Sequence, residues 1–166
     1  MSWDYRLSKL PKALKLLVAS FLFSMFFGYA VSFILLTDQT GLSPDGIEES
    51  YNGNEDDEEA KKLIFRKSNF EILTTVHSHV FTLGVIFVFT GFLVYFTSIQ
   101  STFKLALMIE PLISLVVSFA SLILMWKGFE IFKYLAYLSG GLMHLCFILS
   151  LVLIARELLL RKKPTP

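Results

Sequence analysis

The sequence predicts an all-α fold: an integral membrane four-helix bundle with up-down topology and one acidic extracytoplasmic loop. The first observation behind this prediction is composition, because 54% of the 166 residues are hydrophobic and only 17% are charged. Soluble domains carry about 25% charged residues, and the mean hydropathy of this chain is +0.62. The second is four apolar runs, each close to the roughly 20 residues that span hydrocarbon as a helix. Hydrocarbon offers the backbone no hydrogen-bond partner, so each run must be helical.

The predicted helices belong to a single membrane domain, residues 1–166, and cover about 16–36, 70–99, 103–126 and 131–153. The first run is too long for the apolar part of a signal peptide, and no small-residue cleavage pattern follows it. We therefore expect a retained helix. Short connections between the later runs predict that helices adjacent in the chain are antiparallel.

Two features inside the runs predict how the helices pack. Small residues recur every four positions in the first run: Ser20, Ser24, Gly28 and Ser32. This spacing favours close approach of helix backbones. Cys146 in the fourth run is the one cysteine of the chain, so it forms no intrachain disulfide. We expect it to be a small buried residue.

The basic residues predict the orientation of the bundle. Nine of the 15 Lys and Arg residues lie on the side of both chain ends and of the connection after the second run. Basic residues near helix ends favour the cytoplasm. We therefore expect both termini in the cytoplasm and residues 37–69 outside it.

The extracytoplasmic loop, residues 37–69, is predicted to hold a short helix and an acidic run. Ser43 can cap a helix whose first residue is Pro44, and the Asn-Gly pair at 52–53 can end it. Residues 54–62, NEDDEEAKK, form a charged run that we expect to be solvated. The alternative is that this run docks a basic electron carrier or binds a cation.

The sequence contains none of the short motifs that mark phosphate-binding loops, zinc ribbons or nucleophile elbows. Its basic residues lie at membrane edges and form no nucleic-acid stripe. We therefore identify no catalytic residue and expect no nucleic-acid partner. Enzyme activity of the chain on its own is not favoured.

The three histidines all lie in apolar runs, where hydrocarbon penalises a polar ring. Residues two apart on a helix are about 200° apart around its axis, so His77 and His79 must face different neighbours. The face of His79 also carries threonines: Thr75, Thr82 and Thr90. The face of His77 carries glycines: Gly84 and Gly91.

The histidines of the second and fourth helices predict a cofactor site. These helices run parallel in an up-down bundle, and His79 and His144 lie roughly 14 and 20 Å from their helix starts. Glycines near the histidines would leave a slot for a flat ring: Gly84, Gly91 and Gly141. We predict haem b or a transition metal held by His79 and His144, with His77 as an alternative ligand or a hydrogen-bond donor. The alternative is that the histidines bond across helices to Thr, Ser or Tyr side chains and only fix packing.

Glu110 in the third run is the other candidate site residue. Carboxylates inside membrane helices are rare, and they often mark ion or proton pathways. Glu110 could equally reach the interface or pair with Arg156. A transporter or proton-relay element that uses Glu110 and the histidines is a further reading, which the lack of visible inverted repeats disfavours.

Two segments resemble a known family. LTTVHSHVFTLGVIF, with His77, His79 and Gly84, resembles the H-x-H-x-x-x-L-G helix of a family of small bacterial four-helix membrane proteins, a domain of unknown function. LSGGLMHLCFILSLVL, with Gly141 and His144, resembles the G-x-x-H helix of that family. The resemblance implies a bacterial inner-membrane bundle with a three-histidine constellation, and it implies no reaction. The H-x-H opening is also similar to helices of haem-copper oxidase-like subunits.

The sequence favours a small multi-pass membrane protein that serves as a haem- or metal-binding component of a membrane electron-transfer system. The competing reading is a non-catalytic accessory or assembly subunit whose Phe-rich faces, drawn from 17 Phe residues, pack against partner membrane proteins. Under either reading we expect contact with the lipid bilayer and with other membrane proteins or further copies of the chain.

Overall fold

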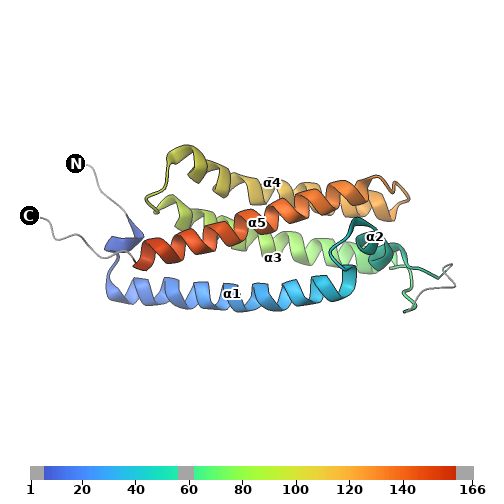
Figure 1. Ribbon diagram of the computed structural model, residues 1–166, viewed down its shortest axis with the longest axis horizontal. Helices are drawn as coiled ribbons and strands as arrows, with labels where there is room; N and C mark the ends of the chain where they lie inside the picture. The colour runs from blue at the N-terminus through green and yellow to red at the C-terminus, as the bar shows by residue number, and fades with distance from the viewer. Residues whose placement is uncertain (1–5, 56–61, 160–166) are drawn as a thin grey trace, which may run out of the picture.

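The computed structural model of the protein describes residues 6–55 and 62–159, which form helices joined by turns (Figure 1). A short 3-10 helix, η1, covers Leu7–Lys9. The α-helices are α1 Lys12–Thr40, α2 Pro44–Asn52, α3 Asn69–Tyr95, α4 Ser101–Trp126 and α5 Phe132–Leu159. Within the described residues, 4 of these helices, all but α2, are long and apolar enough to cross a membrane. The predicted all-α fold with four membrane helices is confirmed.

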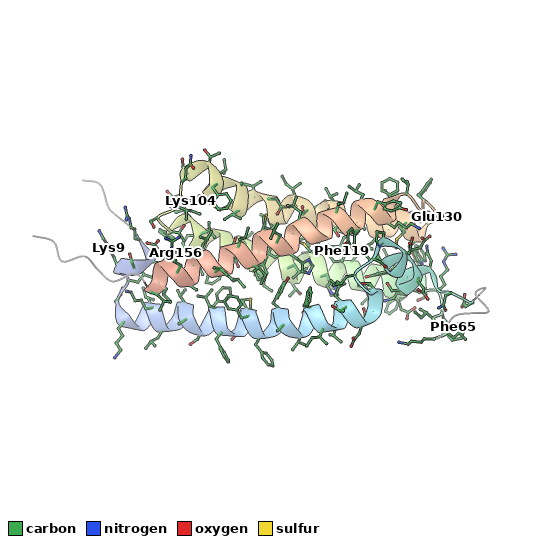
Figure 2. All side chains as sticks on the ribbon, viewed as in Figure 1. Lys9, Phe65, Lys104, Phe119, Glu130 and Arg156 are labelled. Carbon is green, nitrogen blue, oxygen red and sulfur yellow. The ribbon has the colours of Figure 1, made fainter. Side chains whose placement is uncertain are left out.

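The long helices are antiparallel to their neighbours in the chain, so α3 and α5 run parallel (Figure 1). One end of the bundle, here called the η1 end, holds η1, the α3–α4 turn and the end of α5. The opposite end, called the α2 end, holds α2 and the α4–α5 turn. Lys104 and Arg156 lie at the η1 end, whereas Phe65 and Glu130 lie at the α2 end (Figure 2).

The helix bounds differ from the predicted runs. α1 is longer than its run at both ends and stops at Gly41, whose φ of 56° is left-handed and favours glycine. α3 stops at Tyr95 rather than near residue 99. Lys104 Nζ donates to the carbonyls of Tyr95 and Thr97, each at 2.9 Å, and so provides a partner for carbonyls at and just after the helix end.

Helix α1 stands apart from the rest of the bundle. Its buried residues are few: Val18, Leu22 and Thr40. The stripe of small residues Ser20, Ser24, Gly28 and Ser32 is exposed, and a Cβ added at Gly28 would meet nothing within 4 Å. The expectation that this stripe packs closely against another helix is therefore wrong. α1 contacts α3 through large rings instead, with the centroids of Phe21 and Phe89 4.9 Å apart.

The η1 end is fastened by a buried carboxylate. Glu157 of α5 is buried, and its Oε2 accepts from the backbone N–H of Ser98 at 3.0 Å. Its Oε1 accepts from the hydroxyl of Ser8 at 3.4 Å. Beside it, the N–H of buried Leu7 donates to the carbonyl of Phe96 at 3.1 Å. These contacts join the chain start, the α3–α4 turn and the end of α5.

The short helix predicted in the outer loop is confirmed as α2. Ser43 Oγ accepts from the N–H of Gly46 at 3.0 Å, and Pro44 stands in the first turn. The charged run at 54–62 lies mostly outside the described residues. At its flanks, Asn54 Oδ1 accepts from the N–H of Ile64 at 2.7 Å, so the two sides of the run are joined.

Helix α2 is docked on the α2 end of the bundle. Lys133, at the start of α5, forms ion pairs with Asp45 and Glu48 of α2, each with an N–O distance of 2.7 Å. Tyr51 of α2 is packed in the same region, and burial raises the pKa of its phenol above the ordinary value. This part of the loop is therefore an ordered cap on the helix ends.

Replacing Lys133 by Met should loosen α2 while the membrane helices stay folded. The variant leaves the carboxylates of Asp45 and Glu48 without their ammonium partner. Amide hydrogen exchange in α2 should therefore become faster, which mass spectrometry measures. Lys127→Met, at an exposed position just after α4, is the matched control. Unchanged exchange in the Lys133 variant would contradict the docking role.

Candidate functional site

A cavity of about 370 Å³ lies between α1, α3 and α5. It brings together His79 of α3 and His144 of α5, the pair that the sequence predicts as ligands. Several lining residues are exposed on the side of the bundle, among them Gly28 and Thr82. The cavity therefore opens sideways, toward the position of the lipid. Its lining comprises Met25, Gly28, Tyr29, Ser32, Ser78, His79, Thr82, Leu83, Ile86, Phe87, Met143, His144 and Phe147.

The cavity changes from polar to apolar along the bundle. Ser32 lies late in α1 and Ser78 lies early in α3, so both hydroxyls line the part nearest the α2 end. Toward the η1 end, Phe87 and Phe147 close the cavity with rings whose centroids are 5.4 Å apart. An amphipathic molecule would therefore have a preferred direction in this space.

The tautomer of His79 is fixed by the helix that carries it. Its Nδ1 lies 2.9 Å from the carbonyl oxygen of Thr75, one turn earlier. A carbonyl oxygen only accepts, so Nδ1 must be the nitrogen that carries the proton in the neutral ring. Nε2 then keeps a free lone pair. The ring also packs against Phe119 of α4, with centroids 5.6 Å apart, so α4 supports its position.

His144 repeats the same arrangement on α5. Its Nδ1 lies 2.7 Å from the carbonyl oxygen of Gly140, so its Nε2 also keeps the lone pair. The ring of Tyr29 on α1 lies 5.8 Å from the imidazole centroid and 6.1 Å from that of Phe147. Two imidazoles that line one cavity thus each hold Nδ1 against a backbone carbonyl of the preceding turn.

The two histidines do not lie at the same depth. α3 and α5 run parallel, and the contact between Phe87 and Phe147 fixes their register. In this register His144 lies five residues, or roughly 7–8 Å, nearer the η1 end than His79. The offset expected from the sequence is therefore present in the folded bundle.

The other predicted site residues do not line this cavity. His77 is exposed, and its ring packs against that of Phe81, with the ring centroids 4.8 Å apart. Gly84 and Gly91 face α4, because an added Cβ would lie 3.9 Å from Leu115 and 3.6 Å from Met108, respectively. For Gly141, an added Cβ would meet nothing within 4 Å.

Sequence reasoning missed the wall that α1 contributes. Tyr29, Gly28 and Ser32 all line the cavity, and none of them was predicted as a site residue. The small-residue spacing in α1 is the one signal of this wall in the sequence, and such spacing usually indicates helix packing.

Glu110 lies on a different face, between α4 and α5. Its Oε1 accepts from the hydroxyl of Ser114, and Cys146 of α5 lies near the same carboxyl. Arg156 lies ten residues further along α5 than Cys146, about 15 Å away along the helix. The predicted alternative of an ion pair between Glu110 and Arg156 is therefore not formed.

The described part of the chain contains no group of 3 or more His, Cys, Asp or Glu side chains placed to hold a metal ion. Comparison with protein families found one matching family model, Aq_1264_TM, described as a transmembrane helical domain, over residues 41–165. This range includes α2 to α5 and leaves α1 outside. Comparisons with curated proteins and with solved structures each gave no match.

The tautomers can be tested directly by ¹⁵N NMR of protein labelled in histidine. The signals of His79 and His144 should show a protonated Nδ1 and an unprotonated Nε2 near neutral pH, because each Nδ1 faces a carbonyl. His79→Ala and His144→Ala assign the two signals, and His77→Ala should leave both unchanged. A protonated Nε2 in either cavity histidine would contradict the arrangement.

Proposed function

The chain belongs to the Aq_1264_TM family of transmembrane helical domains, and we propose that it is a haem-binding component of a membrane electron-transfer system. One observation carries this proposal. His79 and His144 stand on parallel helices, line the same cavity, and each has Nδ1 committed to a backbone carbonyl. Their two Nε2 lone pairs are the ligands that a bis-histidine haem requires.

Two histidines suit a haem better than a bare ion. The porphyrin supplies four nitrogen ligands of its own, so the protein needs to add only two. Zinc in a structural site takes about four protein ligands. When bound, a haem iron exchanges one electron between its ferric and ferrous states. His79 and His144 would be the residues that hold the haem, and His77, which lies outside the cavity, would take no part.

The rest of the cavity supports an amphipathic flat group. Its volume, about 370 Å³, falls within the roughly 300–1,000 Å³ of small-molecule sites. Ser32 and Ser78 could hold polar groups of such a molecule, whereas Phe87 and Phe147 could pack against its apolar part. The bonds from Nδ1 to the carbonyls of Thr75 and Gly140 would hold both rings in place.

His79→Ala and His144→Ala should each abolish haem binding, whereas His77→Ala should keep it. His77 is the matched control, because it sits two residues from His79 on the same helix but outside the cavity. Protein from haem-supplied cells would be purified in mild detergent. The measurements are the haem content per chain and the reduced-minus-oxidised absorbance spectrum.

Two results would overturn the cofactor proposal in different ways. Loss of haem only in His77→Ala would move the ligand site to the outer face of α3. Colourless, folded wild type from haem-supplied cells would remove haem altogether. The accessory or assembly subunit would then be the better reading, since the exposed aromatic residues of α1 and α3 offer surface to partner membrane proteins.

A second candidate ligand, a lipid-soluble quinol, is favoured by the depth offset of the histidines and by the sideways opening. A quinol carries its two hydroxyls on opposite sides of one ring, so each could donate to a different Nε2. Its apolar tail would leave between the helices into lipid. Organic extraction of the purified protein distinguishes the two ligands, because a quinol-loaded protein lacks the haem spectrum and releases a quinol, which air oxidises to the quinone.

We also propose that both termini lie in the cytoplasm, because Lys9, Lys104 and Arg156 gather at the η1 end (Figure 2). In a Cys146→Ala background, a cysteine at Glu55 should react with an impermeant thiol reagent in intact cells. A cysteine at Ser101, exposed at the η1 end, should react only after the cells are opened. The reverse pattern would invert the orientation.

A further inference from the structure

The core between α3, α4 and α5 contains two polar atoms without a partner. Oε2 of Glu110 is buried and has no hydrogen bond, although its Oε1 accepts from Ser114. Oγ1 of Thr90 is likewise buried without a partner, in a side chain that is only 3% exposed. Native proteins leave few buried polar atoms unpaired, and each such atom points to a missing ligand or a functional role.

The helix register places these two atoms in one layer. The approaches of Gly84 to Leu115 and of Gly91 to Met108 share one antiparallel register between α3 and α4. In that register Thr90 stands level with residues 109–110. From α5, Cys146 lies near the Glu110 carboxyl. Polar residues of three helices therefore lie at the same level of the core.

We propose that this layer, formed by Glu110, Thr90, Ser114 and Cys146, is an intramembrane proton-binding site. Glu110 Oε2, which is buried and has no hydrogen-bond partner among the described residues, takes up the proton. The Ser114 hydroxyl holds Oε1 and so fixes the direction of the carboxyl. Carboxyl groups that bind and release protons inside the bilayer are the working parts of proton relays.

The surroundings select a proton over a metal cation. Hard cations such as Ca²⁺ take about six to eight oxygen ligands, and this layer offers two oxygens without partners. The polar groups at the level of Glu110 are Thr90 from α3, Cys146 from α5 and Ser114 from its own helix, none of which carries a positive charge. A carboxylate without a cationic partner is costly in hydrocarbon, and the protonated form removes that cost.

The proton site is separate from the histidine cavity. That cavity is lined by α1, α3 and α5 and by none of the residues of this layer. The proposal therefore does not rest on haem binding, and the purified chain can be tested whether or not it carries a cofactor.

The test is modification by dicyclohexylcarbodiimide, an apolar reagent that enters the membrane and reacts with protonated carboxyls. The carboxyl O–H adds across one N=C bond, and the product rearranges to a stable N-acylurea. Wild type should gain one reagent per chain, located at Glu110 by peptide mass spectrometry. Glu110→Gln should lose this labelling. Glu130→Gln, at an exposed position in the α4–α5 turn, is the matched control and should keep it.

A second measurement keeps the test decisive if Glu110→Gln does not fold. The infrared spectrum of wild type near neutral pH should show the carbonyl band of a protonated carboxyl, shifted in D₂O. Folded wild type without labelling or band would overturn the proposal, as would labelling that persists at the same level in Glu110→Gln. Protection by Na⁺ at constant pH would overturn it in favour of a cation site.

Discussion

Inside hydrocarbon, every polar hydrogen of this chain has to find its acceptor within the protein, and this constraint shapes the whole bundle. The helices meet it for the backbone. Polar side chains meet it by bonding back to their own helix: Ser150 donates to the carbonyl of Cys146 at 2.8 Å and Ser139 to that of Leu135 at 2.6 Å. His79 and His144 make the same four-residue return with an imidazole. The hydrogen bond back to the helix satisfies the whole hydroxyl proton of a serine. A histidine that makes the same bond through Nδ1 keeps Nε2 without a helix partner, and this nitrogen is available to bind a ligand.

The features that could be predicted from the sequence depend on interactions between residues close together in the chain or on the regular repeat of the helix. Membrane thickness sets the length of an apolar helix, so the long helices were readable from hydropathy alone. α2 was readable because the Ser43 cap is a contact within one turn. The placement of His79 and His144 along one cavity could be predicted from the order of the helices and the position of each histidine in its helix. Helices separated by one antiparallel neighbour run parallel, so α3 and α5 enter the bundle from the same end.

The remainder depends on how each helix is rotated against its neighbours, which periodicity does not specify. Gly84 and Gly91 share a face with each other as expected, but that face meets α4 rather than the cavity. The small residues of α1 do not pack against another helix, and two of them, Gly28 and Ser32, line the cavity instead. The contact of Ser8 with Glu157 joins residues 149 positions apart, and no local sequence pattern predicts such a pair.

Helix α1 is held mainly through the segments at its two ends. Buried Leu7 anchors the segment before it, α2 anchors the segment after it, and its middle buries little. Its 29 residues span about 43 Å, and natural helices curve with radii of roughly 60–100 Å. A bend of that size displaces the midpoint by about 2–4 Å, comparable to the roughly 3.5 Å between carbon atoms in contact. A bend of that size in α1 would widen the space between α1 and the other helices by the thickness of one flat ring, while both ends of α1 stay in place.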